Sequence, residues 1–196
     1  MDKPKYYDIR RDFWRETFDK ALSYEDYLNA SPETHRAKWR AVEAKVAVPD
    51  QAREIVGGFK RRLNVVCHSG VWCGDCSRQG PMLMRLAACN PCIDLRFVER
   101  VDDSRLSDEL RINGALKVPV VVFLSEDFFE LGRFGDRLLT AYRRNARAQL
   151  GPACDTGLVA PGADELAAEV QEWIDIFERM HLVLRLAPLL RERYGD

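Results

Sequence analysis

The chain has six cysteines. Four of them form two CxxC pairs, Cys73 with Cys76 and Cys89 with Cys92, and the other two, Cys67 and Cys154, stand apart. Two thiols three residues apart can exchange electrons with a disulfide or share a metal ion. In a cytosolic chain, redox or metal chemistry is a better explanation of such pairs than a disulfide framework.

The first pair lies where a β-rich run, residues 63–68, gives way to a helical pattern near Cys73. The unpaired N–H groups and positive end of a helix favour a thiolate there. Cys73 is nearer the helix end, so we expect it to be the nucleophile, with Cys76 as the resolving thiol. The carboxylate of Asp75 should partly oppose the lowering of the Cys73 pKa.

Composition excludes several classes of function. Thirty Lys and Arg residues stand against 31 Asp and Glu residues, so no basic excess exists to hold nucleic acid or an anionic membrane. The longest apolar run, near residues 118–124, is far short of the ~20 residues that span a bilayer. The N-terminus lacks the apolar stretch of a secretory signal, which predicts a cytoplasmic protein.

The elements that must position the cysteines follow from capping signals and periodicity. Ser23 and Asp26 form a capping box, Ser31 with Pro32 predicts a second helix start, and Pro49 opens a third helix through about Arg62. The remaining pattern predicts strands at 63–68, 94–100, 118–124 and 128–133, and helices at about 73–88, 104–113 and 135–150. A loop at 151–162 precedes an amphipathic helix that Pro188 should stop.

The segment from Trp72 to Cys76, WCGDC after an apolar strand, resembles the active-site signature of the thioredoxin superfamily. Pro81, five residues after the second cysteine, resembles the proline of the family's active-site helix, and 128–135 resembles its last hairpin strand and turn. The resemblance covers about residues 50–147. The helices around 23–28 are similar to those of a bacterial subgroup with a helical N-terminal extension.

The resemblance also implies roles for residues outside the CxxC pair. Pro119 would be a cis-proline facing the cysteines, and the backbone of Val118 would pair with an extended client segment. Trp72 would shield the pair and provide an apolar contact. Members of the family usually bury a carboxylate six residues before the first cysteine, where this chain has Cys67, and the lysine that pairs with it would fall near Val98 or Glu99.

This departure leaves Cys67, Asp75 and Glu99 as modulators of the site, and deprotonation of Cys76 should be slower or differently tuned. Cys67 otherwise reads as a small buried hydrophobe. His68 beside it is expected to be packed or hydrogen-bonded rather than catalytic.

The second cysteine pair offers an alternative, a four-thiolate zinc or iron–sulfur site. An intervening helix would separate Cys76 and Cys89 by ~20 Å along its axis, which argues against one ion reaching both pairs. We therefore expect Cys89 and Cys92 to be free thiols or a local disulfide, and Cys154 to be an exposed thiol.

Together these observations predict an α/β protein of thioredoxin-like fold, a central sheet of about four strands flanked by helices, with added N- and C-terminal helices. Residues 1–49 would form the extension, 50–150 the thioredoxin-like domain, and 151–196 a loop and helix packed on it. The expected function is a thiol–disulfide oxidoreductase of cell redox homeostasis. It would need no cofactor or bound metal and would act on a disulfide-containing protein or a small thiol, with neither nucleic acid nor membrane as a partner. A redox-regulated binding module, a metal-binding protein and a homodimer stay open.

Overall fold

The structure, a computed structural model, describes residues 4–150 and 165–195. The predicted loop at 151–162, with Cys154, lies outside these residues. The strands are β1 (Leu63–Ser69), β2 (Ile93–Glu99), β3 (Val120–Leu124) and β4 (Glu130–Gly135). The helices are α1 (Arg11–Lys20), α2 (Tyr24–Asn29), α3 (Glu33–Glu43), α4 (Asp50–Gly57), α5 (Gly74–Ala87), α6 (Arg105–Glu109), α7 (Leu139–Leu150), α8 (Glu165–Leu186) and α9 (Pro188–Tyr194). The predicted α/β class with a four-stranded sheet is confirmed.

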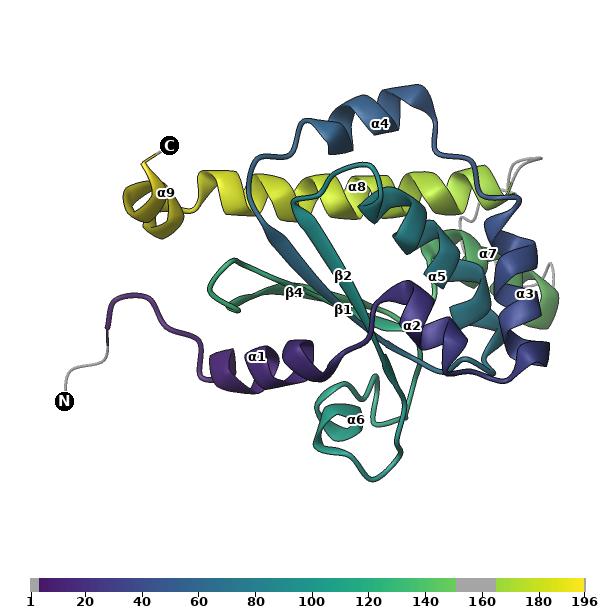
Figure 1. Cartoon of the computed structure of the whole chain (residues 1–196). Coiled ribbons are helices and arrows are strands. Elements are labelled where there is room, and N and C mark those ends of the chain that lie inside the picture. Colours follow the sequence, from purple (N-terminus) through teal and green to yellow (C-terminus); the bar gives the residue numbers. More distant parts are fainter. Residues whose placement is uncertain (1–3, 151–164, 196) are drawn as a thin grey trace.

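The sheet has the strand order β2-β1-β3-β4, with β1 central and parallel to β2. Strand β3 runs antiparallel to both β1 and β4, so β3 and β4 form the predicted hairpin. Figure 1 shows α8 crossing one side of the sheet, while α1 and α6 lie on the opposite side. Helix α5 starts just after β1 ends, on the side of α8 (Figure 1).

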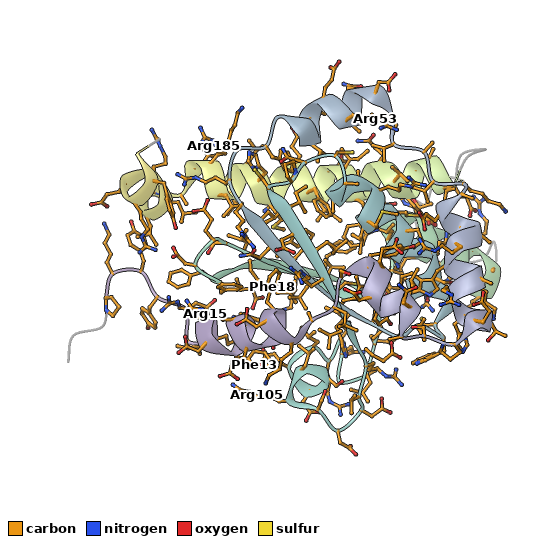
Figure 2. All side chains as sticks on the ribbon, in the orientation of Figure 1. Phe13, Arg15, Phe18, Arg53, Arg105 and Arg185 are labelled. Atoms are coloured by element: carbon orange, nitrogen blue, oxygen red, sulfur yellow. The ribbon has the colours of Figure 1, made fainter. Side chains whose placement is uncertain are left out.

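Two apolar clusters fill the space on the two faces of the sheet. Because successive side chains of a strand point to opposite faces, Val65 and Cys67 of β1 enter the larger cluster and Val66 enters the smaller one. The smaller cluster is closed by α1 and α6. There the guanidinium group of Arg105 lies 4.4 Å from the ring centroid of Phe13 (Figure 2).

The N-terminal extension wraps around one edge of the sheet. Trp14 of α1 is buried in the smaller cluster, whereas Tyr27 of α2 and Trp39 of α3 are buried in the larger one. The chain crosses between the faces at Leu22, whose backbone N–H and C=O both bond to Phe97 of β2, at 2.9 and 2.7 Å. The extension therefore covers part of the outer edge of β2.

The capping predictions succeeded at α2 and failed at α3. The Ser23 hydroxyl accepts a hydrogen bond from the Asp26 amide at 3.1 Å, which is the N-cap bond of the predicted box, and donates to the Asp26 carboxylate at 2.6 Å. The residue before α3 is Pro32, without a side-chain cap, and the Ser31 hydroxyl instead donates to the Tyr27 carbonyl at 2.7 Å. The hydroxyl therefore bonds to a carbonyl of the preceding helix α2 instead of capping α3.

Several helix bounds differ from the prediction. Helix α6 ends at Glu109 rather than at residue 113, and α7 begins at Leu139 rather than at residue 135. Backbone reasons explain two further differences, at the end of α4 and after α8. Helix α4 ends at Gly57 rather than near Arg62, because the Gly57–Gly58 pair disfavours continued helix. Helix α8 ends at Leu186, just before Pro188 as expected, but that proline begins α9. Proline suits the first turn of a helix, where its missing N–H would have had no partner.

No helix within 4–150 or 165–195 combines the length and apolar character that a membrane span requires.

Candidate dithiol site

The CxxC pair lies where β1 passes into α5. Cys73 is the N-cap residue of α5, with an extended backbone at φ −79° and ψ 132°, and its side chain is half-buried. Cys76 lies in the first turn of the helix and is fully buried. The predicted order of exposure, with Cys73 outside and Cys76 inside, is what the structure has.

The environment of Cys73 favours its thiolate. The pKa of the Cys73 thiol is lowered to about 6, chiefly by a hydrogen bond from the Cys76 thiol. The backbone N–H groups of Asp75 and Cys76 at the start of α5 lower it further, while partial burial and the Asp75 charge act against them. The predicted opposition of Asp75 is therefore present, and the helix end outweighs it.

Cys76 has the opposite environment. Burial raises the pKa of the Cys76 thiol well above its ordinary value, and the adjacent Cys73 raises it further. The backbone N–H of Gly70 donates to Cys76 Sγ at 3.3 Å and partly counteracts this rise. Cys76 is therefore a protonated thiol in the resting dithiol.

Asp75 is bound by a basic partner that the sequence did not indicate. Its Oδ2 accepts from Nε of Arg137 at 2.9 Å and lies 2.8 Å from a second guanidinium nitrogen. Arg137 also lies 3.9 Å from the buried carboxylate of Asp136, which Lys117 approaches at 3.3 Å. This ion-pair chain joins the CxxC turn to the segments that flank β3 and β4.

The Val118–Pro119 peptide bond is cis, and its segment faces Cys73. When protonated, the Cys73 thiol donates to the Val118 carbonyl, with Sγ and O 3.7 Å apart. Gly135 lies so close behind that a Cβ there would be 2.6 Å from the Pro119 carbonyl oxygen. Glycine at this turn therefore lets β4 end against the proline loop.

Trp72 lies beside the pair and is 49% exposed. The guanidinium group of Arg100 lies 4.7 Å from the centroid of the Trp72 ring, an arrangement that orients the indole. About half of the Trp72 side chain is thus open to solvent beside the CxxC pair.

The position of the usual family carboxylate is occupied by a neutral thiol. Cys67 is buried under α5, and burial raises the pKa of its thiol. On the neighbouring strand, the Glu99 carboxylate accepts hydrogen bonds from the Val71 amide at 3.0 Å and from the Tyr27 hydroxyl. Val98 points to the other face of the sheet, in the smaller cluster. The structure therefore places Glu99, and not Val98, next to the CxxC turn.

No sequence pattern indicated that Tyr27 and Trp39 would lie next to this site. Tyr27 lies in the stretch that resembled the extended subgroup, but helical spacing did not say which way its hydroxyl points. The Trp39 indole N–H donates to the Val71 carbonyl at 3.0 Å in a buried bond. Both contacts join residues far apart in the chain and could not be read from local patterns.

Cys89 and Cys92 lie away from this constellation. Cys89 and Cys92 follow the C-terminal end of α5 and are free thiols, and the Cys89 thiol donates to the Arg85 carbonyl at 3.3 Å. Within the part of the chain that the structure describes, no three His, Cys, Asp or Glu side chains are grouped to hold a metal ion.

His68 is buried, with Nε2 3.2 Å from the Ser107 hydroxyl of α6. Its burial, with the charge of Arg100, lowers the pKa of His68 to about 4. It is a packed, neutral histidine on the face of β1 opposite the dithiol.

Comparisons with known proteins place this geometry in a family. No curated protein matches the chain. A solved protein of unknown function from Pseudomonas aeruginosa is similar with a TM-score of 0.57 and 24% identity, over 85% of this chain and 91% of that one. A scaffold protein that carries an HIV epitope is similar with a TM-score of 0.56 and 22% identity, over 85% and 92%. A family model described as thioredoxin matches residues 21–140, more than half of the chain, and the protein therefore belongs to the thioredoxin family.

Proposed function

We propose that this protein is a thiol–disulfide oxidoreductase that works through Cys73 and Cys76. The observation that carries the proposal is the opposite tuning of the two thiols. Cys73 has a pKa of about 6 and a partly exposed sulfur, whereas Cys76 is buried and has a raised pKa. An attacking thiol must be a thiolate near neutral pH, and a resolving thiol must stay protonated until the mixed disulfide forms.

The reaction would proceed in two balanced exchanges. The Cys73 thiolate attacks one sulfur of the client disulfide, the client S–S bond breaks, and the other client sulfur leaves as a thiolate. Cys76 then gives its proton to the departed client thiolate or to water and attacks Cys73 Sγ. This closes the Cys73–Cys76 disulfide and releases the second client sulfur as a thiolate. The client gains two electrons and the protein loses them.

The proposed client is a protein with an extended segment around its disulfide, or a small disulfide. The exposed part of the Trp72 side chain offers an apolar contact beside the CxxC pair. The Val118 backbone at the cis-Pro119 turn would bind the client main chain, a role that the family resemblance implies. The Val118 carbonyl already lies 3.7 Å from Cys73 Sγ, close enough for the attacking sulfur and a bound segment to meet.

The test is the reduction of a model disulfide substrate by the wild type and by three single variants. Cys73→Ser should lose turnover, and Cys76→Ser should accumulate a mixed disulfide through Cys73. Cys89→Ser is the matched control, since it removes a CxxC thiol away from the site, and it should keep wild-type turnover. Undiminished turnover of Cys73→Ser would contradict the assignment.

A redox titration in thiol–disulfide buffers, with peptide mapping of alkylated cysteines, gives the direction of the reaction. Known members of the family range from roughly −270 mV for reductants to −120 mV for oxidants. A reversible Cys73–Cys76 transition with no turnover of disulfide substrates would favour the redox-regulated binding module. Cysteines that alkylate only after a chelator is added would favour a metal site.

A further inference from the structure

The turn between β1 and α5 is fixed by hydrogen bonds on three consecutive peptide groups. The first joins Ser69 to Gly70: its Ser69 carbonyl accepts a hydrogen bond from the Arg100 amide at 2.7 Å, and its Gly70 N–H donates to Cys76 Sγ at 3.3 Å. In the second, the Gly70 carbonyl accepts from the Cys73 amide at 2.9 Å, and the Val71 N–H donates to Glu99.

The third peptide group is fixed by the N-terminal extension. Its Val71 carbonyl accepts the Trp39 indole N–H at 3.0 Å. The Tyr27 hydroxyl donates to the same Glu99 oxygen that accepts the Val71 N–H. We call Tyr27, Trp39 and Glu99 the Val71 clamp, because together they bind both polar backbone groups of Val71.

The two aromatic side chains of the clamp are buried and closely packed, and Glu99 is partly buried. Tyr27 is 3% exposed and its ring stacks on Phe97 with centroids 5.4 Å apart, while its edge contacts the Trp39 ring at 5.7 Å. Burial and the adjacent Glu99 raise the pKa of the Tyr27 hydroxyl, so this group stays protonated and remains a donor. Few alternative conformations are therefore open to the groups that hold Val71.

Gly70 lies between the clamp and the resolving thiol. A glycine can rotate about φ and ψ more freely than any other residue, so nothing in Gly70 itself aims its N–H at Cys76. The Gly70 N–H lies in the Ser69–Gly70 peptide plane, which the Arg100 amide holds at the Ser69 carbonyl. The clamp holds the next plane at Val71 and so limits how far the first plane can turn about Gly70. The orientation of the Gly70 N–H is thus set by contacts on both sides of it.

We propose that Tyr27 and Trp39 of the N-terminal extension are positioning residues of the dithiol site, which hold Gly70 so that its N–H stabilises the sulfur of Cys76 as it loses its proton. The inference rests on the proposed function and specifies its second exchange. The extension would then control how fast the mixed disulfide is resolved, with little effect on the first attack by Cys73.

The test separates the two exchanges with Ellman's reagent, a small aromatic disulfide. The Cys73 thiolate displaces one thionitrobenzoate and forms a mixed disulfide with the other half. Attack by Cys76 then closes the Cys73–Cys76 disulfide and releases the second thionitrobenzoate. Replacing the three cysteines outside β1 and the site by serine (Cys89, Cys92 and Cys154) leaves a background in which both releases can be followed by stopped flow.

Tyr27→Phe is compared with Tyr24→Phe in this background. Both changes remove one hydroxyl from α2, and both rings pack on Trp39 and Phe97, but the Tyr24 hydroxyl bonds to Glu43 at 3.2 Å instead of Glu99. In Tyr27→Phe we expect the first release to stay within about twofold of the parent and the second to slow about tenfold, the effect of a weakened hydrogen bond to a charged group. The pH dependence of the second release should move to higher pH.

Trp39→Phe provides a second variant, which removes the indole N–H that donates to the Val71 carbonyl, with thermal unfolding to check that it folds. Slower second release in Tyr27→Phe, with Tyr24→Phe unchanged, supports the inference. Equal rates in Tyr27→Phe and the parent overturn it, and so does equal slowing in both tyrosine variants, which would indicate general loosening of α2. A parent protein that releases only one thionitrobenzoate contradicts the dithiol function itself, and the inference with it.

Discussion

At the scale of single residues, the properties of the site depend on charged residues that lie outside the CxxC motif. The order of exposure of Cys73 and Cys76 follows from a helix start, which the sequence predicted. Their opposite pKa directions come chiefly from the hydrogen bond between the two thiols and from the burial of Cys76. The partner of Asp75 did not follow, because Arg137 is 62 residues away and reaches the site only when β4 ends beside the proline loop. Local sequence patterns can indicate where a helix begins, but they do not indicate ion pairs between residues far apart in the chain.

The Asp75–Arg137 ion pair should tune Cys73. The Asp75 charge raises the Cys73 pKa and Arg137 partly neutralises that charge. Below pH 6 the thiolate fraction limits alkylation by iodoacetamide, so at pH 5 we expect the rate to rise about threefold in Asp75→Asn and to fall about threefold in Arg137→Ala. Alkylation rates measured from pH 4 to pH 9 give the pKa of Cys73 in each variant and the direction in which it has shifted.

Arg144→Ala is the control for Arg137→Ala, because Arg144 pairs with Glu165 at 2.7 Å on α8. Its alkylation profile should match that of the wild type. Faster alkylation of Arg137→Ala at pH 5 would show that the arginine does not shield the Asp75 charge.

At the scale of elements, the contact between α3 and α5 positions the active-site helix. A Cβ at Gly80 of α5 would lie 2.0 Å from a ring carbon of Trp39, so the two helices approach each other through this glycine. The sequence predicted both helices but not their crossing. Nothing local marks Gly80 as a packing position, since glycine inside a helix is otherwise only unfavourable.

We expect Gly80→Ala to lower the free energy of unfolding by about 1–3 kcal/mol, because a rigid indole ring must move to admit the methyl group. Gly74→Ala is the matched control on the same helix, where an added Cβ meets nothing within 4 Å. It should be neutral or slightly stabilising. Urea unfolding curves of both variants test this, and equal stabilities would contradict the close approach at Gly80.

Element boundaries were less predictable than the elements themselves. The strands were placed to within two residues, because short runs rich in β-branched and aromatic residues between turn signals mark strands well. Helix α9 was missed because a proline that stops one helix can equally begin the next. The Ser31 hydroxyl was assigned to the wrong helix, since two helix ends lie within reach of it.

At the scale of the molecule, the predicted segments 1–49, 50–150 and 151–196 share one core among their described residues. Trp39 of the extension, Val65 of the sheet and Trp173 of α8 all belong to the larger apolar cluster. Composition and resemblance located the thioredoxin-like part, but which segments bury one another depends on tertiary packing that no single stretch encodes.

This shared core predicts one cooperative unfolding transition. Urea unfolding followed by tryptophan fluorescence, which reports Trp14, Trp39 and Trp173 in their buried positions, should coincide with unfolding followed by far-UV circular dichroism. The reduced protein is the appropriate sample, so that disulfide exchange adds no further species. Separate midpoints for the two signals would contradict the single core and indicate an extension that unfolds alone.

The two backbone hydrogen bonds between Leu22 and Phe97 also affect the tendency of the protein to aggregate at high concentration. The outer strand of an open sheet presents unpaired amides and carbonyls, a template on which further chains can add and grow into fibrils. In this protein both backbone groups of Phe97, in the interior of β2, are already taken by the chain's own Leu22. The extension that buttresses the dithiol thus also interrupts this edge as a template for aggregation.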